Sequence, residues 1–196
     1  MLNLVEEIAL FPLQTVLYPG GPLSLRIFET RYLDMVSRCL KEEQGFGVCL
    51  IREGSETGTA RIHMTGTLAR IRDWSQGPDG LLHILARGEQ RFHVHSLRIK
   101  ADGLNLGQVE WLADEPAAEL PEARQDMADL LRQIIQQVGG PYADEEGSYS
   151  DAGWVGSRLS ELLPISLPQR QYLLELSDPL KRLEIISTLA QSLAST

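Results

Sequence analysis

Four histidines come closest, among the side chains of this sequence, to the spacing of a metal site. His93 and His95 lie two residues apart in a segment with a strand-like pattern, so we expect both rings on one face of that strand. A β-scaffold presents two metal ligands in this way, and His63 and His83 are the remaining histidines that would complete a set. Because no pair of cysteines lies nearby, we interpret His93 and His95 as surface histidines and predict neither a metal nor another cofactor.

Nucleotide hydrolysis and proteolysis each require short motifs that this sequence lacks. Lys41, Lys100 and Lys181 follow leucine or isoleucine, whereas a phosphate-binding loop needs Gly-Lys-Ser/Thr. No histidine is followed by glutamate as in a zincin helix, and no serine stands in Gly-x-Ser-x-Gly. A serine activated by Lys41 is a weak alternative, since residues 40–43 have the pattern of a solvated helix end. We therefore predict no catalytic residue.

Composition and charge narrow the choice of partner. The chain has 196 residues, 43% of them apolar and 23% charged, which is typical of a globular protein. Its net charge is -9, of which residues 1–113 contribute -1 and residues 114–196 contribute -8. An acidic protein repels phosphate, so nucleic acid is not an expected partner. Cys39 and Cys49 both lie in apolar patterns and are interpreted as core thiols.

The distribution of apolar and charged residues along the chain predicts the cellular location of the protein. No segment approaches the roughly 18 consecutive apolar residues that span a membrane. The first seven residues include two glutamates and no basic residue, whereas a signal peptide begins with basic residues. We therefore expect a cytoplasmic protein without a membrane partner.

The first half of the chain predicts short strands around one helix. Apolar residues at helical spacing predict a helix that is capped by Thr30 and runs to about Glu43. Turn residues separate the strands, most clearly at 18–22, where two prolines and two glycines follow Tyr18. The strands are predicted over residues 7–11, 23–28, 46–51, 61–74, 81–86, 90–99 and 106–112. Strands this frequent favour a closed barrel or a sandwich.

The second half changes to helical periodicity. An apolar stripe over 121–138 ends at two glycines, and a second helix ends before Pro164. Ser166 and Asp178 each precede a proline and are predicted to cap two more helices. Leu183, Ile186 and Leu193 either pack inside the helical half or form part of a homodimer or partner surface. We place the domain boundary so that 1–116 is β-rich and 117–196 is helical, and the acidic segment 144–146 is predicted to be a loop.

Several segments together closely resemble the amino-terminal, substrate-binding domain of the ATP-dependent Lon proteases. They are Ile8 to Leu13, Val16 to Gly21, Leu25 to Tyr32, Phe46 to Val48, Gly66 to Ile71, Asp79 to Gly80, Gly88 to Phe92 and Leu159 to Pro164. The resemblance covers essentially the whole chain and implies an α+β fold, a PUA-like β pseudo-barrel followed by a small α-helical bundle. Cereblon, a substrate receptor of a ubiquitin ligase, carries a related domain. Since the sequence stops at Thr196, before an ATPase or Ser-Lys protease domain, the expected relatives are stand-alone bacterial LON-domain proteins.

The resemblance implies peptide binding rather than proteolysis. Tyr18, Arg31 and Tyr32 are candidates to line a groove in which aromatic faces and a guanidinium hold an extended, partly apolar peptide. Trp74, in a segment that we predict to be a loop over 73–78, is either a further contact residue or a lid on the barrel.

A structural interpretation of the same motif stays open beside the functional one. Phe11, Ile27 and Phe28 have the character of core residues, and Arg26, Glu29 and Arg31 are placed to join the strand to the helix through ion pairs.

Three functions remain at this point. The preferred one is a non-catalytic module that binds unfolded or tagged polypeptides and serves a separate protease or chaperone. An RNA-binding PUA-like module is the first alternative, because the β half holds most of the arginines. A hydrolase of unrecognised type, working through His83, His93 and His95, is the second.

Overall fold

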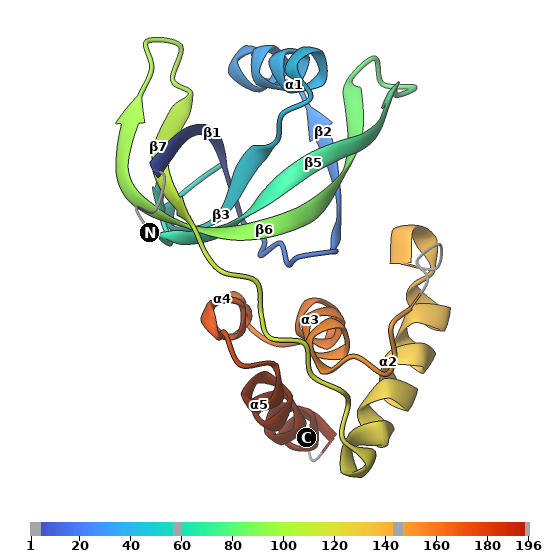
Figure 1. Cartoon of the computed structure of the whole chain (residues 1–196). Helices are drawn as coiled ribbons and strands as arrows, with labels where there is room; N and C mark the ends of the chain where they lie inside the picture. Colours follow the sequence, from blue (N-terminus) through green and yellow to red (C-terminus); the bar gives the residue numbers. More distant parts are fainter. Residues whose placement is uncertain (1–4, 57–59, 143–146, 195–196) are drawn as a thin grey trace. The chain divides into compact units, whose positions relative to one another are not determined.

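Figure 1 shows the computed structural model of the chain, which describes residues 5–56, 60–142 and 147–194. The chain divides into two compact units, Met1–Ala113 and Asp114–Thr196. The strands belong to the first unit, the β unit, and four of the five α-helices belong to the second, the helical unit. The predicted fold class, a β pseudo-barrel followed by a helical bundle, is confirmed.

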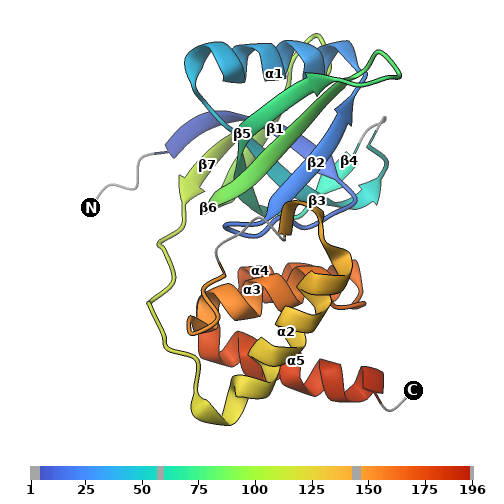
Figure 2. The same ribbon diagram turned by 90° about the vertical axis from the view of Figure 1, so that its right-hand side faces the viewer.

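The β unit is built on one seven-stranded sheet. Its elements are β1 (Val5–Leu13), β2 (Pro22–Ile27), α1 (Thr30–Glu42), β3 (Phe46–Gly54), β4 (Ala60–Ile62), β5 (Thr65–Gln76), β6 (Leu82–Ile99) and β7 (Asn105–Trp111). Antiparallel neighbours run in the order β1-β7-β6-β5-β3-β4, and a parallel pairing of β1 with β3 closes the barrel. Strand β2 lies outside this path and pairs with β6 (Figure 2).

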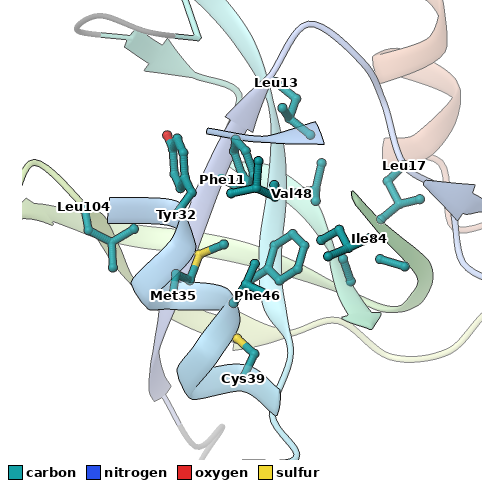
Figure 3. Close-up of a cluster of buried hydrophobic side chains, with 14 residues drawn as sticks. Phe11, Leu13, Leu17, Tyr32, Met35, Cys39, Phe46, Val48, Ile84 and Leu104 are labelled. Atoms are coloured by element: carbon teal, nitrogen blue, oxygen red, sulfur yellow. The ribbon is translucent and has the colours of Figure 1, made fainter. Parts of the chain in front are cut away.

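The main core of the β unit lies between helix α1 and the sheet. Phe11 of β1 stacks on Tyr32 of α1 with 3.8 Å between ring centroids, and Phe46 of β3 lies tilted against Phe11 (Figure 3). Met35 and Cys39 follow Tyr32 on the buried face of the helix, as the helical spacing predicts. Each large apolar side chain enclosed here contributes about 2 kcal/mol by leaving water. The amphipathic face of α1 thus fixes the helix on the strands.

The predicted cap of α1 is wrong by one residue. Glu29, not Thr30, occupies the N-cap position, and its side chain makes no capping hydrogen bond. Its carboxylate instead accepts a hydrogen bond from Nε of Arg31, 2.9 Å away. The backbone carbonyl of Glu29 accepts the N–H groups of Tyr32 and Leu33, which begins the helix.

Two of the predicted strand boundaries are also wrong. The strand expected over 61–74 is broken at His63 and Met64, because β4 pairs with β3 alone whereas β5 continues along β6. The two strands expected over 81–86 and 90–99 form one strand, β6, which passes through Gly88 without a turn. Gly88 exchanges backbone hydrogen bonds with Gly20 and Gly21, so its lack of a side chain permits a close approach of two chains.

The helical unit has the helices α2 (Gln125–Val138), α3 (Ala152–Leu162), α4 (Leu167–Glu175) and α5 (Pro179–Ala194), and short 3-10 turns at Glu122–Arg124 and Gly140–Tyr142. Ser166 forms a capping box with Gln169 at the start of α4. The carboxylate of Asp178 accepts the backbone N–H groups of Leu180 and Lys181 at the start of α5. Both predicted caps are confirmed. The predicted loop at 144–146 lies outside the described residues.

A buried arginine holds the helical unit together. Arg182 of α5 is fully buried and donates hydrogen bonds to the carbonyl oxygens of Leu173 and Leu176, at 2.9 and 2.7 Å. Both of its terminal nitrogens also bond to the carboxylate of Glu115, which precedes the first helix of this unit. The guanidinium therefore joins α5 to the end of α4 and to the distant segment before α2.

The three leucine and isoleucine residues of α5 that were considered for a partner surface differ in their burial. Leu183 and Ile186 are buried, and Leu183 packs beside Gly156 of α3. Leu193 remains exposed. Among the described residues, no helix is both long and apolar enough to cross a membrane.

Candidate functional site

Strand β2 forms one side of the barrel surface, and the turn before it explains its position. Gly20 adopts a positive φ of 77°, and the N–H of Gly21 bonds to the carbonyl oxygen of Tyr18 at 2.9 Å. Such a backbone conformation favours glycine. The Gly88 N–H then donates to the Gly21 carbonyl at 2.8 Å, which starts the pairing of β2 with β6.

A hollow of about 390 Å³ lies over β2, β6 and β5. It is lined by Ser24, Leu25, Arg26, Asp73, Trp74, Ser75, His83, Ile84 and Leu85. The strand register places Ser24 and Arg26 on the same sheet face as His83 and Leu85, opposite to the face of Leu25. Leu25 packs against the main core. The outer face thus carries the half-exposed Leu85 among polar and charged side chains.

An ionic group borders this outer hollow. A terminal nitrogen of Arg26 lies 2.5 Å from a carboxylate oxygen of Asp79, and Nε2 of His83 lies 3.4 Å from the same oxygen. The pKa of Asp79 is lowered, chiefly by a hydrogen bond from the backbone N–H of Leu81 and also by its bonds to Arg26 and His83. Asp79 therefore remains ionised and holds Arg26 beside the strand.

A second, smaller cleft of about 70 Å³ includes residues from the opposite side of β2. Its walls are Phe11, Leu13, Leu25, Arg26, Ile27, Phe28, Glu29, Tyr32 and Glu56. Leu25 and Arg26 line both the cleft and the outer hollow. Phe28 is 60% exposed, although the sequence analysis assigned it to the core. Leu23, Leu25 and Ile27 face inward at period two, and this alternation was the signal that Phe28 would face outward.

The four predicted contact residues do not form one groove. Tyr18 is fully buried, and Tyr32 is buried in its stack with Phe11, where burial raises the pKa of its hydroxyl. Arg31 and Tyr32 do meet, with the guanidinium 4.6 Å from the ring centroid. Trp74 lies in β5 rather than in a loop and is 58% exposed at the outer hollow.

Arg31 connects the start of helix α1 to the turn between β6 and β7 and to the segment after β3. Its guanidinium bonds to the carboxylate of Glu29 and to the carbonyl oxygens of Gly103 and Glu56, at 2.9 and 3.3 Å. The structural interpretation therefore describes Arg31 and Glu29 well. Arg26, which was placed in the same corner, pairs with Asp79 instead.

The histidines and cysteines have separate surroundings. The rings of His93 and His95 lie 5.4 Å apart, and Nε2 of His95 lies 2.8 Å from a carboxylate oxygen of Glu110. In the part of the chain that the structure describes, no three His, Cys, Asp or Glu side chains are grouped to hold a metal. Cys39 and Cys49 are both buried, and burial raises the pKa of each thiol.

A third hollow, of about 400 Å³, lies beside the end of α1. Glutamates at its border have partners inside the β unit, since Glu6 accepts from the Trp111 indole and Glu7 pairs with Arg98. These bonds engage two of the glutamates at its border. We take the surface around β2 as the candidate site because its two hollows carry the exposed aromatic rings of Phe28 and Trp74.

The model of the ATP-dependent protease La (LON) substrate-binding domain matches residues 7–192. The chain belongs to this LON family. The LON domain described here is 38% identical to a Lon N-terminal domain protein from Xanthomonas campestris. The two structures superpose with a TM-score of 0.79, and the alignment covers 94% of this chain and 98% of the Xanthomonas chain.

Two sequence relatives place the LON domain among larger proteins. The Lon protease of Phenylobacterium zucineum is 24% identical over 96% of this chain and 25% of its own length. Protein cereblon of Danio rerio is 29% identical over 56% of this chain and 26% of its own length. The LON domain thus spans about a quarter of the length of these relatives. The predicted family and the predicted relation to cereblon are confirmed.

Proposed function

We propose that this LON domain binds segments of unfolded or tagged polypeptide in the cytosol, does not cleave them, and serves a separate protease or chaperone. The observation that carries the proposal is the surface around β2, where an exposed strand lies between two hollows. Exposed aromatic rings, Phe28 and Trp74, line these hollows. The free energy of binding becomes more favourable when apolar side chains of an unfolded chain leave water and contact these rings.

The surroundings of the arginines favour polypeptide over RNA as the ligand. A phosphate backbone requires cations that are gathered and available. Many arginines of the β unit instead pair with carboxylates of the same unit: Arg26, Arg31, Arg52, Arg61, Arg70, Arg72 and Arg98. These internal pairs reduce the positive potential that RNA would need.

The test uses a fluorescent, permanently unfolded polypeptide, such as a reduced and carboxymethylated protein, at low and high salt and with or without ATP. Anisotropy measures binding, and gel electrophoresis of the same samples measures cleavage. We expect salt-tolerant binding that needs no ATP and leaves the polypeptide intact. Binding of RNA that falls steeply with salt, together with no binding of the unfolded chain, would refute the proposal.

Variants locate the binding surface. Phe28→Ala and Leu85→Ala each remove an apolar contact from one of the hollows and should weaken binding several-fold. Ile99→Ala is the matched control, because Ile99 is similarly exposed but belongs to neither hollow. Equal losses in all three variants would place the binding surface elsewhere.

A further inference from the structure

Strand β2 is an edge strand whose second side pairs with no other strand among the described residues. The direction of its backbone groups follows from the register. Residues opposite one another in an antiparallel pair alternate between those that exchange hydrogen bonds and those that do not. Gly88 donates to Gly21, so Leu23, Leu25 and Ile27 exchange bonds with β6.

The N–H and C=O groups of Ser24 and Arg26 therefore point away from β6. Pro22 has the same phase, and a proline, which has no N–H to offer, is typical of this side of an edge strand. Ser24 and Arg26 are exposed residues. The free edge thus offers two donors and two acceptors at the spacing of a β-strand.

The outer hollow and the cleft border β2 on its two faces, and this arrangement suits the alternating side chains of a bound strand. Successive side chains of an extended chain point to opposite faces. A strand laid along β2 would direct one set of side chains to the outer face, beside Ser24 and Arg26 at the rim of the outer hollow, and the alternate set toward the cleft beside Phe28 and Leu25. Leu25 and Arg26 line both the outer hollow and the cleft. The two sets of peptide side chains would therefore contact neighbouring residues of β2.

Charge indicates which side chains suit each face. The side chain of Arg26 is 63% exposed on the outer face even in its pair with Asp79, so it favours an acidic or hydroxyl side chain opposite to it. The cleft is mostly apolar, and the carboxylate of Glu29 at its wall is already neutralised by Arg31. An apolar side chain therefore suits the cleft.

We propose that the LON domain takes its polypeptide as an added antiparallel or parallel strand on the free edge of β2, hydrogen-bonded to the backbone of Ser24 and Arg26. Its ligand is a segment in which apolar residues alternate with polar or acidic ones. This inference rests on the proposed function and names the form in which the polypeptide is recognised. Backbone bonds provide the affinity, and the alternating side chains provide the selectivity.

The direct test is amide hydrogen exchange of the full chain with a fluorescein-labelled octapeptide, acetylated and amidated, in which valine and leucine alternate with threonine and glutamate. We expect the amide protons of Ser24 and Arg26 to become protected when the peptide binds. Those of Leu23 and Leu25 are already bonded to β6 and should change little. Unchanged exchange at Ser24 and Arg26 at saturating peptide would overturn the proposal.

Methylation of single peptide nitrogens tests the same geometry from the ligand. Each N-methyl group removes one donor, so methylation at residues facing β2 should weaken binding about tenfold, and methylation at the alternate residues should have little effect. Ser24→Pro removes one donor from the protein and should also weaken binding about tenfold. Ile99→Ala, which lies outside both hollows, is the control and should bind normally. A methylation series without period two would overturn the proposal.

The outcomes separate the two proposals. If the unfolded polypeptide binds but the octapeptide does not, strand addition is wrong and the proposed function stands. If neither ligand binds, the proposed function fails as well. Circular dichroism of Ser24→Pro confirms the fold, and the methylated peptides, which leave the protein unchanged, decide the question if that variant is unfolded.

Discussion

The two units of this LON domain differ in where they keep their polar groups. The helical unit encloses Arg158 and Arg182 completely, each paired with a glutamate. Among the described charged residues of the β unit, Arg91 alone is buried, and the edge of β2 directs backbone groups outward. The helical unit therefore uses its polar groups to hold its own shape, whereas the β unit has polar groups available for a ligand.

The largest expected effect tests the buried arginine of the helical unit. Arg182→Met removes the guanidinium that now donates hydrogen bonds to the Glu115 carboxylate and to the carbonyl oxygens of Leu173 and Leu176. We expect a loss of about 4 kcal/mol in the free energy of unfolding. Urea denaturation followed by circular dichroism at 222 nm measures it.

The neighbouring residue supplies the control. Lys181 is exposed on the same helix, and Lys181→Met should change stability by less than about 0.5 kcal/mol. Adding Glu115→Leu to Arg182→Met removes the unpaired carboxylate and should restore part of the loss. If Arg182→Met is no less stable than Lys181→Met, the buried arginine does not support the unit.

A pair of phenylalanines tests the same contrast inside the β unit. Phe46 is buried between α1 and the sheet, and Phe28 is exposed. Phe46→Ala should cost about 3 kcal/mol because it leaves a cavity, while Phe28→Ala should cost less than about 1 kcal/mol. Thermal unfolding compares the two variants. Similar losses would mean that Phe28 is a core residue after all and that the cleft is closed in solution.

The sequence predicted what depends on neighbouring residues. The apolar spacing of α1, the cap at Ser166 and the glycine turn before β2 are local signals, and each predicted element is present. The continuity of β6 through Gly88 and the free edge of β2 depend on pairing between distant strands, which no local pattern contains. Tyr18 was expected at a groove because it is aromatic, but only the packing decides that it is buried.

Alkaline pH should weaken the β unit selectively, because both cysteines of the chain lie there. Burial raises the pKa of the Cys49 thiol, so the folded state keeps it neutral while the unfolded state ionises near pH 8.5. The stability that Cys49 contributes is complete below that pH and is lost as the pH rises above it.

Between pH 7.5 and 9.5 we therefore expect the wild-type chain to lose about 1.4 kcal/mol more than Cys49→Ala. Urea denaturation of both proteins across this range gives the two slopes, and other titrating groups contribute equally to each. Parallel slopes would show that the thiol reaches water in the folded protein.

The smallest effect compares how a helix starts in each unit. In α4 the Ser166 hydroxyl accepts the backbone N–H of Gln169, so Ser166→Ala should cost about 1 kcal/mol. In α1 the residue that local pattern favours as the cap, Thr30, already lies inside the helix and is exposed. Thr30→Ala should thus change stability by less than about 0.5 kcal/mol, because alanine is the better helix former. Urea denaturation measures both, and a loss in Thr30→Ala equal to that in Ser166→Ala would mean that the Thr30 hydroxyl, rather than the ion pair of Glu29 with Arg31, secures the start of α1.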